Sequence, residues 1–192
     1  MIAIIKYPAG NITSVENAVN RLGYQCVVTD DVELLKSADK VIFPGVGEAS
    51  TAMKSLKETG LDKIIPALTQ PVLGICLGQQ LMCNFSEENN TECLGIFNTT
   101  VKKFPPTELV PHMGWNDLKV EQSRLLEGVS AEDNFYFVHS FYAEVCESTT
   151  ATCDYILPFS AVMEKDNFYA TQFHPEKSAD AGERILKNFL EF

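Results

Sequence analysis

The stretch VLGICLGQQ, residues 72–80, decides the fold of this chain. Its apolar start, residues 72–75, predicts a buried strand, and a helical pattern follows over residues 77–84. Cys76 therefore stands on a tight turn from a strand into a helix, with a glycine two positions away on each side. Enzymes that place a nucleophile on a strained turn use this G-x-nucleophile-x-G pattern, because the glycines remove side chains that would collide there.

The residues before this stretch repeat the alternation of apolar runs and helical patterns. The predicted elements are strands at residues 1–6, 24–28 and 40–43 and helices at residues 14–22 and 48–59. Strands separated by helices in this way indicate a parallel sheet with helices on both faces. Open sheets of this kind build their sites at the carboxyl ends of the strands, so we expect Cys76 at that edge.

The second half of the chain has a different sequence pattern, in which short β-rich segments replace the helical periodicity. These predicted strands lie at residues 96–103, 134–145, 161–164 and 168–173. A final helix follows, with Asp180 as its predicted N-cap and Glu183 three residues later. We predict one α/β domain over residues 1–192, with a mostly parallel central sheet flanked by helices and an antiparallel or mixed β extension.

Composition and charge exclude several classes of protein. The 192 residues include 26 acidic and 15 basic ones, a formal net charge of −11, without the Lys and Arg cluster that a nucleic-acid binder needs. The apolar runs are too short to cross a bilayer and no signal peptide is visible, so we expect a cytoplasmic protein without membrane contact. The six cysteines form no CxxC pair, which excludes a zinc ribbon.

Cys76 has two interpretations, a nucleophile on a strained turn or a buried structural cysteine beside two packing glycines. The helix that starts after it favours a thiolate over a thiol, because the positive end of the helix dipole faces the sulfur. The amide of Leu77 is then free to donate to an oxyanion. We favour the nucleophile.

A histidine and a carboxylate follow the last predicted strand as His174-Pro175-Glu176. In an extended segment, residues two apart point to the same side, so Glu176 can reach His174. A base beside a nucleophile, oriented by a carboxylate, is the arrangement of a catalytic triad. His139 lies among apolar residues, which favours a structural histidine over a catalytic one. For His112, a surface, a partner-facing and a structural position all stay open.

Two glycines, Gly45 and Gly47, follow the strand predicted at residues 40–43 and flank Val46. The loop lacks both phosphate-binding patterns, GxxxxGK[ST] and GxGxxG. Close glycines allow backbone amides to approach a ligand, so an oxyanion or carboxamide loop beside Cys76 is the favoured interpretation and a tight turn the alternative.

Taken together, the motifs resemble the class I (triad) glutamine amidotransferases. The segments that carry the resemblance are PGVG at residues 44–47, GICLGQQLM at 74–82 and ATQFHPEKS at 170–178. Within that family the chain looks most like the glutaminase subunits of imidazole glycerol phosphate synthases. That closer likeness rests on PAGN at residues 8–11, HMGWN at 112–116 and YFVHSFY at 136–142.

The resemblance implies a glutaminase. Cys76 would form a glutamyl thioester, and His174, oriented by Glu176, would move the proton. Amides of Leu77 and of the loop Gly45, Val46 and Gly47 would stabilise the oxyanion. Residues implied to hold the glutamine are Gln80, His139 and Ser140.

The resemblance also implies a partner, a (β/α)₈-barrel cyclase that receives the ammonia and makes imidazole glycerol phosphate, with no cofactor or metal in this chain. Positions expected at the interface of this heterodimer are Asn11, Met113, Trp115 and Lys177. Three alternatives stay open: a glutaminase for anthranilate, guanylate or pyridoxal phosphate synthesis, a non-catalytic subunit on the same fold, and a free-standing cysteine hydrolase.

Overall fold

The computed structural model describes residues 1–8, 11–121 and 123–192. Its centre is an eight-stranded sheet with the order β2-β1-β3-β4-β14-β13-β12-β9. The strands are β1 (Ile2–Ile5), β2 (Cys26–Thr29), β3 (Lys40–Gly45), β4 (Val72–Cys76), β9 (Lys119–Val120), β12 (Thr149–Tyr155), β13 (Leu157–Lys165) and β14 (Phe168–Thr171).

The sheet changes character at β14. The five strands from β2 to β14 run parallel, whereas β13, β12 and β9 continue the sheet antiparallel. The predicted mostly parallel sheet with a mixed extension is therefore confirmed. Two smaller sheets complete the extension: β10 (Phe135–His139) pairs with β8 (His112–Asn116), and β7 (Phe97–Lys103) lies between β11 (Phe141–Ala143) and β5 (Cys83–Ser86), which pairs with β6 (Thr91–Glu92).

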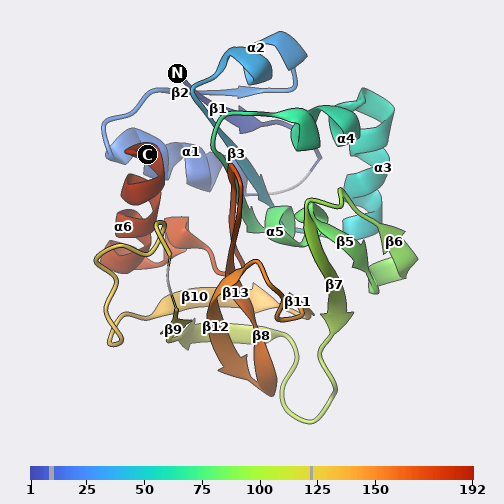
Figure 1. Cartoon of the computed structure of the whole chain (residues 1–192), viewed down its shortest axis with the longest axis vertical. Helices are drawn as coiled ribbons and strands as arrows, with labels where there is room; N and C mark the ends of the chain where they lie inside the picture. Colours follow the sequence, from blue (N-terminus) through green and yellow to red (C-terminus); the bar gives the residue numbers. More distant parts are fainter. Residues whose placement is uncertain (9–10, 122) are drawn as a thin grey trace.

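Helices cover both faces of the parallel strands because alternate residues of each strand point to opposite faces. In β1, Ile2 and Ile4 face a core shared with helices α1 (Ile12–Arg21) and α6 (Ala179–Leu190). Ala3 and Ile5 face a second core, shared with α2 (Val32–Ser37), α3 (Ala49–Thr59), α4 (Leu61–Ile64) and α5 (Leu77–Met82). Figure 1 shows α1 and α6 on one side of the sheet and α3, α4 and α5 on the other. Three short 3-10 helices, η1 (Ile65–Ala67), η2 (Glu88–Asn90) and η3 (Pro175–Lys177), join these elements.

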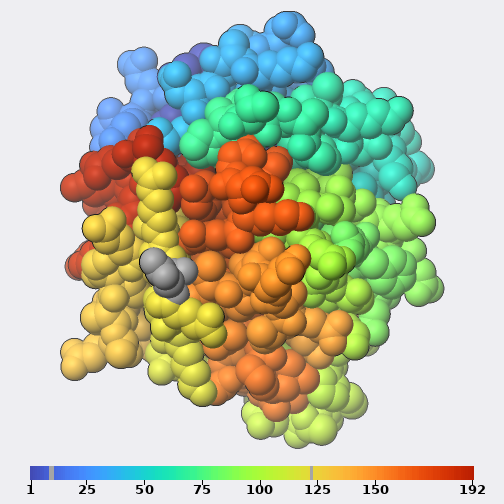
Figure 2. All heavy atoms as spheres, viewed as in Figure 1, coloured from blue at the N-terminus to red at the C-terminus, as the bar shows by residue number. Residues whose placement is uncertain are grey.

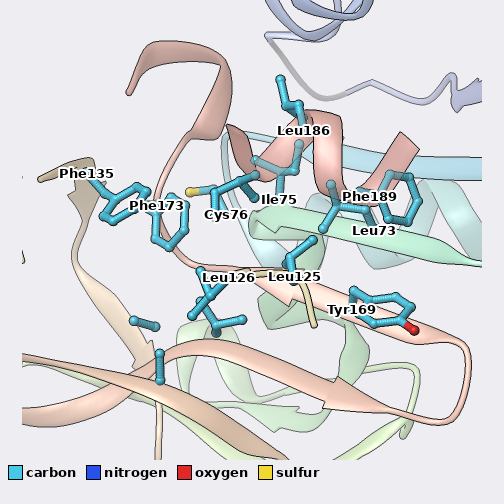
Figure 3. Close-up of a cluster of buried hydrophobic side chains, with 14 of the residues drawn as sticks. Leu73, Ile75, Cys76, Leu125, Leu126, Phe135, Tyr169, Phe173, Leu186 and Phe189 are labelled. Atoms are coloured by element: carbon cyan, nitrogen blue, oxygen red, sulfur yellow. The ribbon is translucent and has the colours of Figure 1, made fainter. Parts of the chain in front are cut away.

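The core beneath α6 reaches the end of β4. Leu186 and Phe189 of α6 lie close to Leu73 and Ile75, and the sulfur of Cys76 lies at the edge of this cluster (Figure 3). Full burial of each large apolar side chain stabilises the fold by about 1.5–3 kcal/mol. The strand that carries Cys76 is thus held on a rigid support.

Several element boundaries differ from those predicted. Helix α5 ends at Met82 rather than near residue 84, because Cys83 adopts an extended conformation and pairs with β7. The strand predicted over residues 134–145 is two strands, interrupted at Ser140. Strands β8 and β12 and helix α2 carried no pattern strong enough to predict.

The start of α6 also differs from the prediction. The N-cap position is Ser178 rather than Asp180, and it makes no side-chain capping hydrogen bond. Its hydroxyl instead donates to the His174 carbonyl oxygen at 2.6 Å and accepts from the Tyr136 amide at 2.9 Å. Ser178 therefore fixes the segment that holds His174 against β10.

The early and late parts of the chain cover different ends of the molecule. Figure 2 shows blue and cyan atoms of the first helices at one end and green to orange atoms of the later strands at the other. Among the described residues there is no helix with the length and apolar character needed to span a bilayer.

Candidate active site

Cys76 is the last residue of β4 and immediately precedes α5. Its backbone angles are φ 54° and ψ −106°, a conformation that residues with a side chain rarely adopt. Strain of this kind costs about 1–3 kcal/mol and persists only where the surrounding structure enforces it. Cys76 is thus held in the strained turn that its sequence predicted.

The glycines on either side of Cys76 allow this turn. A Cβ atom on Gly78 would overlap the carbonyl oxygen of Phe43 in β3, and one on Gly74 would lie 2.8 Å from the Met82 sulfur. The first collision is with backbone, which cannot move aside. A side chain is therefore excluded at Gly78, and one at Gly74 would have to displace the Met82 sulfur and would crowd the Gln79 amide nitrogen at 3.0 Å.

His174 follows β14, the strand that lies beside β4. Its Nδ1 atom is 2.8 Å from Glu176 Oε1, and both side chains are completely buried. We expected these residues to meet on an extended segment, but Glu176 lies on the 3-10 helix η3, which turns its carboxylate back towards the imidazole. With Nδ1 occupied, Nε2 is the nitrogen that remains available to Cys76.

Cys76 and Glu176 both favour the charged form of His174. Burial lowers this pKa, but hydrogen bonding and charge from Cys76 and Glu176 outweigh burial and raise it to about 10. Figure 3 places the Cys76 sulfur beside Phe173, the residue that precedes His174. Residues 98 positions apart in the sequence, 76 and 174, are brought together by the pairing of β4 with β14.

The Gly45–Gly47 loop lies beside Cys76 because Gly45 is paired with Cys76 across β3 and β4. A side chain at Gly45 would overlap the Tyr7 hydroxyl, which donates to the Pro44 carbonyl oxygen at 2.8 Å. Burial, with a smaller contribution from Cys76, raises the pKa of Tyr7, so its hydroxyl remains a neutral donor. Gly47 has a different requirement, a φ of +121° that favours glycine.

A cleft of about 420 Å³ opens beside Cys76. Its described lining residues are Val46, Gly47, Cys76, Leu77, Gln80, Glu88, Pro111, Val138, His139, Ser140 and Phe141. A larger hollow of about 700 Å³ lies between α3 and β6, but its described lining contains neither cysteine nor histidine. The smaller cleft is therefore the one with reactive groups.

Comparison with known proteins identifies the family. The chain matches the family Glutamine amidotransferase class-I over residues 4–192. The chain belongs to the class I glutamine amidotransferases. The amidotransferase is 63% identical to the imidazole glycerol phosphate synthase subunit HisH of Bacteroides fragilis over 99% of this chain and 98% of the relative. It is 60% identical to the subunit of the same name from Bacteroides thetaiotaomicron, with the same coverage.

Solved structures agree on the fold. A glutamine amidotransferase crystal structure superposes with a TM-score of 0.78 at 21% identity and covers 100% of this chain and 98% of its own. A second glutamine amidotransferase structure, from Thermotoga maritima, superposes with a TM-score of 0.66 at 16% identity. The match covers 99% of this chain and 82% of the Thermotoga maritima chain. At such identities the likeness shows the fold alone.

Glu88 is a charged residue of the cleft that the sequence did not point to. Among the described residues that line the cleft, Glu88 supplies the carboxylate group. Its Oε2 accepts a hydrogen bond from the Ala49 amide at 2.8 Å. Burial raises the pKa of Glu88, partly opposed by that hydrogen bond. No motif marks Glu88, because η2 brings it to the cleft from outside the Cys76 segment.

Gln80 lines the cleft, but its amide is directed into the protein. Its Nε2 donates to the Phe141 carbonyl oxygen and to Gln172 Oε1, each at 2.9 Å. Gln172 in turn donates from Nε2 to Cys76 Sγ at 3.6 Å. Sequence reasoning did not single out Gln172, because it lies inside a motif that His174 and Glu176 dominated.

His139 lines the same cleft but has no free ring nitrogen. Its Nδ1 lies 2.7 Å from the Phe141 carbonyl oxygen and must donate to it, so its Nε2 accepts from His112 Nδ1 at 3.0 Å. His112 stacks on Tyr155, with ring centroids 4.1 Å apart. Burial lowers the pKa of His139 to about 3 and that of His112 to about 4. The geometry fits the structural interpretation of His139.

Of the four residues expected at an interface, three are exposed at the surface and one, Asn11, contacts the candidate active site. Met113 and Trp115 lie two apart on β8 and are exposed by 62% and 54%, and Lys177 is also exposed. Asn11 instead donates from its side chain to Glu176 Oε1, and the same nitrogen is 3.4 Å from His174 Nδ1. Its described contacts are therefore within the site. The PAGN segment at residues 8–11 includes residues 9 and 10, which lie outside the described residues.

Proposed function

We propose that this amidotransferase is the glutaminase subunit of an imidazole glycerol phosphate synthase, working in the cytoplasm. It hydrolyses glutamine to glutamate and ammonia, and the ammonia passes to a cyclase subunit. The observation that carries the proposal is the strained Cys76 beside a histidine–carboxylate pair, in a chain 63% identical to a subunit of that synthase.

Cys76 is the proposed nucleophile. Its thiol proton moves to His174 Nε2, and the sulfur forms a bond to the carbon of the glutamine side-chain amide while the carbonyl electron pair moves to oxygen. His174, whose pKa of about 10 favours the protonated form, then gives the proton to the leaving nitrogen. Ammonia departs and leaves a glutamyl thioester, which water hydrolyses to glutamate.

Backbone amides stabilise the oxyanion in this proposal. Leu77 is the first residue of α5, so its amide has no partner within the helix, and the Gly45–Gly47 loop lies across from it. Removing one such donor costs about 3–4 kcal/mol of transition-state stabilisation in well-studied hydrolases. Val46 belongs to the same loop and lines the cleft.

The charged ends of glutamine need partners in the cleft. The half-buried carboxylate of Glu88 supports a contact with the substrate's α-ammonium group, and Ser140 can hydrogen-bond near the α-carboxylate. Gln80 and His139 use their polar atoms within the protein, so we propose that they shape the cleft wall.

The cyclase is proposed to cover the exposed face of β8. Exposed Met113 and Trp115 offer apolar anchors of the kind that concentrate binding energy at interfaces. Trp115 also packs edge-on against Tyr136 at 6.0 Å, which holds its ring in place. Lys177 lies next to Glu176 in the sequence, so a partner bound there would be close to the triad.

The test measures glutamate released from glutamine by this chain alone, then with the cyclase and its phosphoribosyl nucleotide substrate. We expect slow release by the chain alone and a large increase with partner and nucleotide. Cys76→Ala should abolish release while the complex still forms on gel filtration. Glutamate release by Cys76→Ala would refute the assignment of the nucleophile, and an unchanged rate with the cyclase would point to another partner.

A further inference from the structure

The buried side chain of Gln172 contacts the sulfur of Cys76, the proposed nucleophile. It follows β14, where Thr171 is paired with Ile75 of β4, so the next residue on each strand, Gln172 and Cys76, are neighbours at the carboxyl edge. Gln172 is completely buried, and its Nε2 donates to Cys76 Sγ at 3.6 Å. Such a distance is within the usual range for a nitrogen donor and a sulfur acceptor.

The orientation of the Gln172 amide is fixed by its neighbour. Gln80 Nε2 donates to Gln172 Oε1 at 2.9 Å, so the oxygen of Gln172 must face Gln80 and its nitrogen must face the sulfur. Gln80 is itself held by the Phe141 carbonyl oxygen, which accepts from the same nitrogen. A flipped Gln172 amide would set two donors against each other, and the network excludes that arrangement.

We propose that Gln172 is a further catalytic residue, which stabilises the Cys76 thiolate by a directed N–H donor. The proposal rests on Cys76 being the nucleophile of the proposed function. Cys76 is itself nearly buried, and a thiolate in such a place needs donors to replace water. When the thiol proton moves to His174, the negative charge stays on sulfur, where a hydrogen bond to an ion is roughly twice as strong as one to the neutral thiol.

The same hydrogen bond from Gln172 also fixes the position of the Cys76 sulfur. Gln172 directly follows β14 and Gln80 lies on α5. The chain of hydrogen bonds from the Phe141 carbonyl oxygen through both amides therefore ties Sγ to these two elements and to the cleft wall. When the bond from sulfur to the substrate carbon forms, the sulfur loses its charge and the donor becomes less important. The contribution of Gln172 is therefore greatest in the step that creates and positions the thiolate.

The experiment measures the rate at which iodoacetamide alkylates Cys76 as a function of pH, followed on the Cys76 peptide by mass spectrometry. Gln172→Met removes the donor at nearly constant size, and Gln79→Met is the matched control. Gln79 is an equally buried glutamine next to Gln80, but its Nε2 donates to the Ser160 carbonyl oxygen and not to sulfur.

We expect Gln172→Met to alkylate about tenfold or more slowly near neutral pH, with its pH profile displaced to higher pH, because a hydrogen bond to an ion is lost. Gln79→Met should keep the profile of the unchanged chain. Gln172→Glu keeps the oxygen that accepts from Gln80 but puts a carboxylate near the sulfur, so it should displace the profile at least as far.

An unchanged profile in folded Gln172→Met, or an equal displacement in Gln79→Met, would overturn the proposal. Should Gln172→Met fail to fold, Gln172→Leu, which also lacks the donor and adds no charge, decides in the same way. Alkylation needs neither glutamine nor the cyclase, so a displaced profile together with absent glutamine hydrolysis would leave this inference standing and reject the proposed function instead. In the active complex, the loss should fall on kcat rather than on KM.

Discussion

The buried histidine His174 and the buried pair His139 and His112 have pKa values displaced in opposite directions. His174 is completely buried, and its pKa is raised to about 10. His139 and His112 are 6% and 4% exposed, and their pKa values are lowered to about 3 and 4. Burial acts in the same direction on all three rings, so burial alone cannot account for the difference.

The difference comes from the partners of each ring. His174 faces an acidic pair, Cys76 and Glu176, which favour the charged imidazolium. His139 and His112 face each other, a carbonyl group and aromatic rings. The first environment suits a residue that carries a proton during a reaction, and the second suits neutral rings that support a cleft wall.

Removing the ring of His174, the proposed proton carrier, should have the largest effect. His174→Gln should lower kcat/KM for glutamine hydrolysis in the complex by about 10²–10⁴-fold, the usual contribution of a general acid–base group. Glutamate release measured in a coupled assay gives this ratio, and Glu183→Gln, an exposed change on α6, is the control. A loss smaller than about tenfold would mean that His174 is not the proton carrier.

Removing the carboxylate should have a smaller effect. Glu176→Gln keeps a hydrogen-bonding group beside His174 but removes its charge, so the pKa of His174 should fall while the ring stays in place. We expect kcat/KM to fall by about 10–100-fold, less than the full general acid–base contribution. NMR titration of the His174 ring in this variant should show the lower pKa, and an unchanged value would contradict the comparison.

The two groups should also affect stability at opposite ends of the pH range. His112 and His139 bind fewer protons in the folded than in the unfolded protein, so their contribution is present above about pH 6.5 and is lost as pH falls towards their folded values. His174 has the reverse sign, and its contribution is present below about pH 6.5 and is lost as pH rises towards 10.

Urea unfolding between pH 4 and 10 tests these signs, with unfolding free energies compared between the unchanged chain and His174→Gln. The variant should lose stability less steeply above about pH 6.5 and should behave like the unchanged chain on the acid side. Identical alkaline slopes in the two proteins would show that His174 is not charged in the folded state.

The smallest expected effect is in the neutral pair. His112→Phe preserves the aromatic stack on Tyr155 but removes the donor to His139 Nε2, leaving a buried acceptor unpaired. The free energy of unfolding at pH 7 should fall by about 1–3 kcal/mol. Its decline between pH 6.5 and 4 should also be shallower, because one of the two low-pKa rings is gone. A variant more stable than the unchanged chain at pH 7 would contradict the proposed hydrogen bond.

Local patterns in the sequence were enough to predict the strained turn. The glycines at 74 and 78 stand at a fixed spacing from Cys76, and the apolar run before Cys76 is long enough to indicate a buried strand. The backbone that Gly78 must clear, at Phe43, belongs to β3 and comes from the fold. The parallel sheet followed from alternating elements, which is also a short-range property. The pairing of Glu176 with His174 was predicted for the wrong local reason, since η3 and not an extended segment brings them together.

Local sequence patterns gave wrong element boundaries where contacts between distant segments decide the structure. Helix α5 was extended too far because Cys83 leaves it to pair with β7, a choice made by tertiary packing. Asp180 has the local signature of an N-cap, but Ser178 holds that position through its bonds to β10 and to the His174 segment.

The sequence by itself determined the turn at Cys76, the layered fold and the family, because each depends on residues close together in the chain or on motifs of fixed spacing. Only the tertiary structure decided that β14 brings His174 and Gln172 to Cys76, that η2 brings Glu88 to the cleft, and that Asn11 contacts Glu176. These contacts depend on which strands pair and how the loops pack, and the pKa values depend on charges that meet only once the chain is folded.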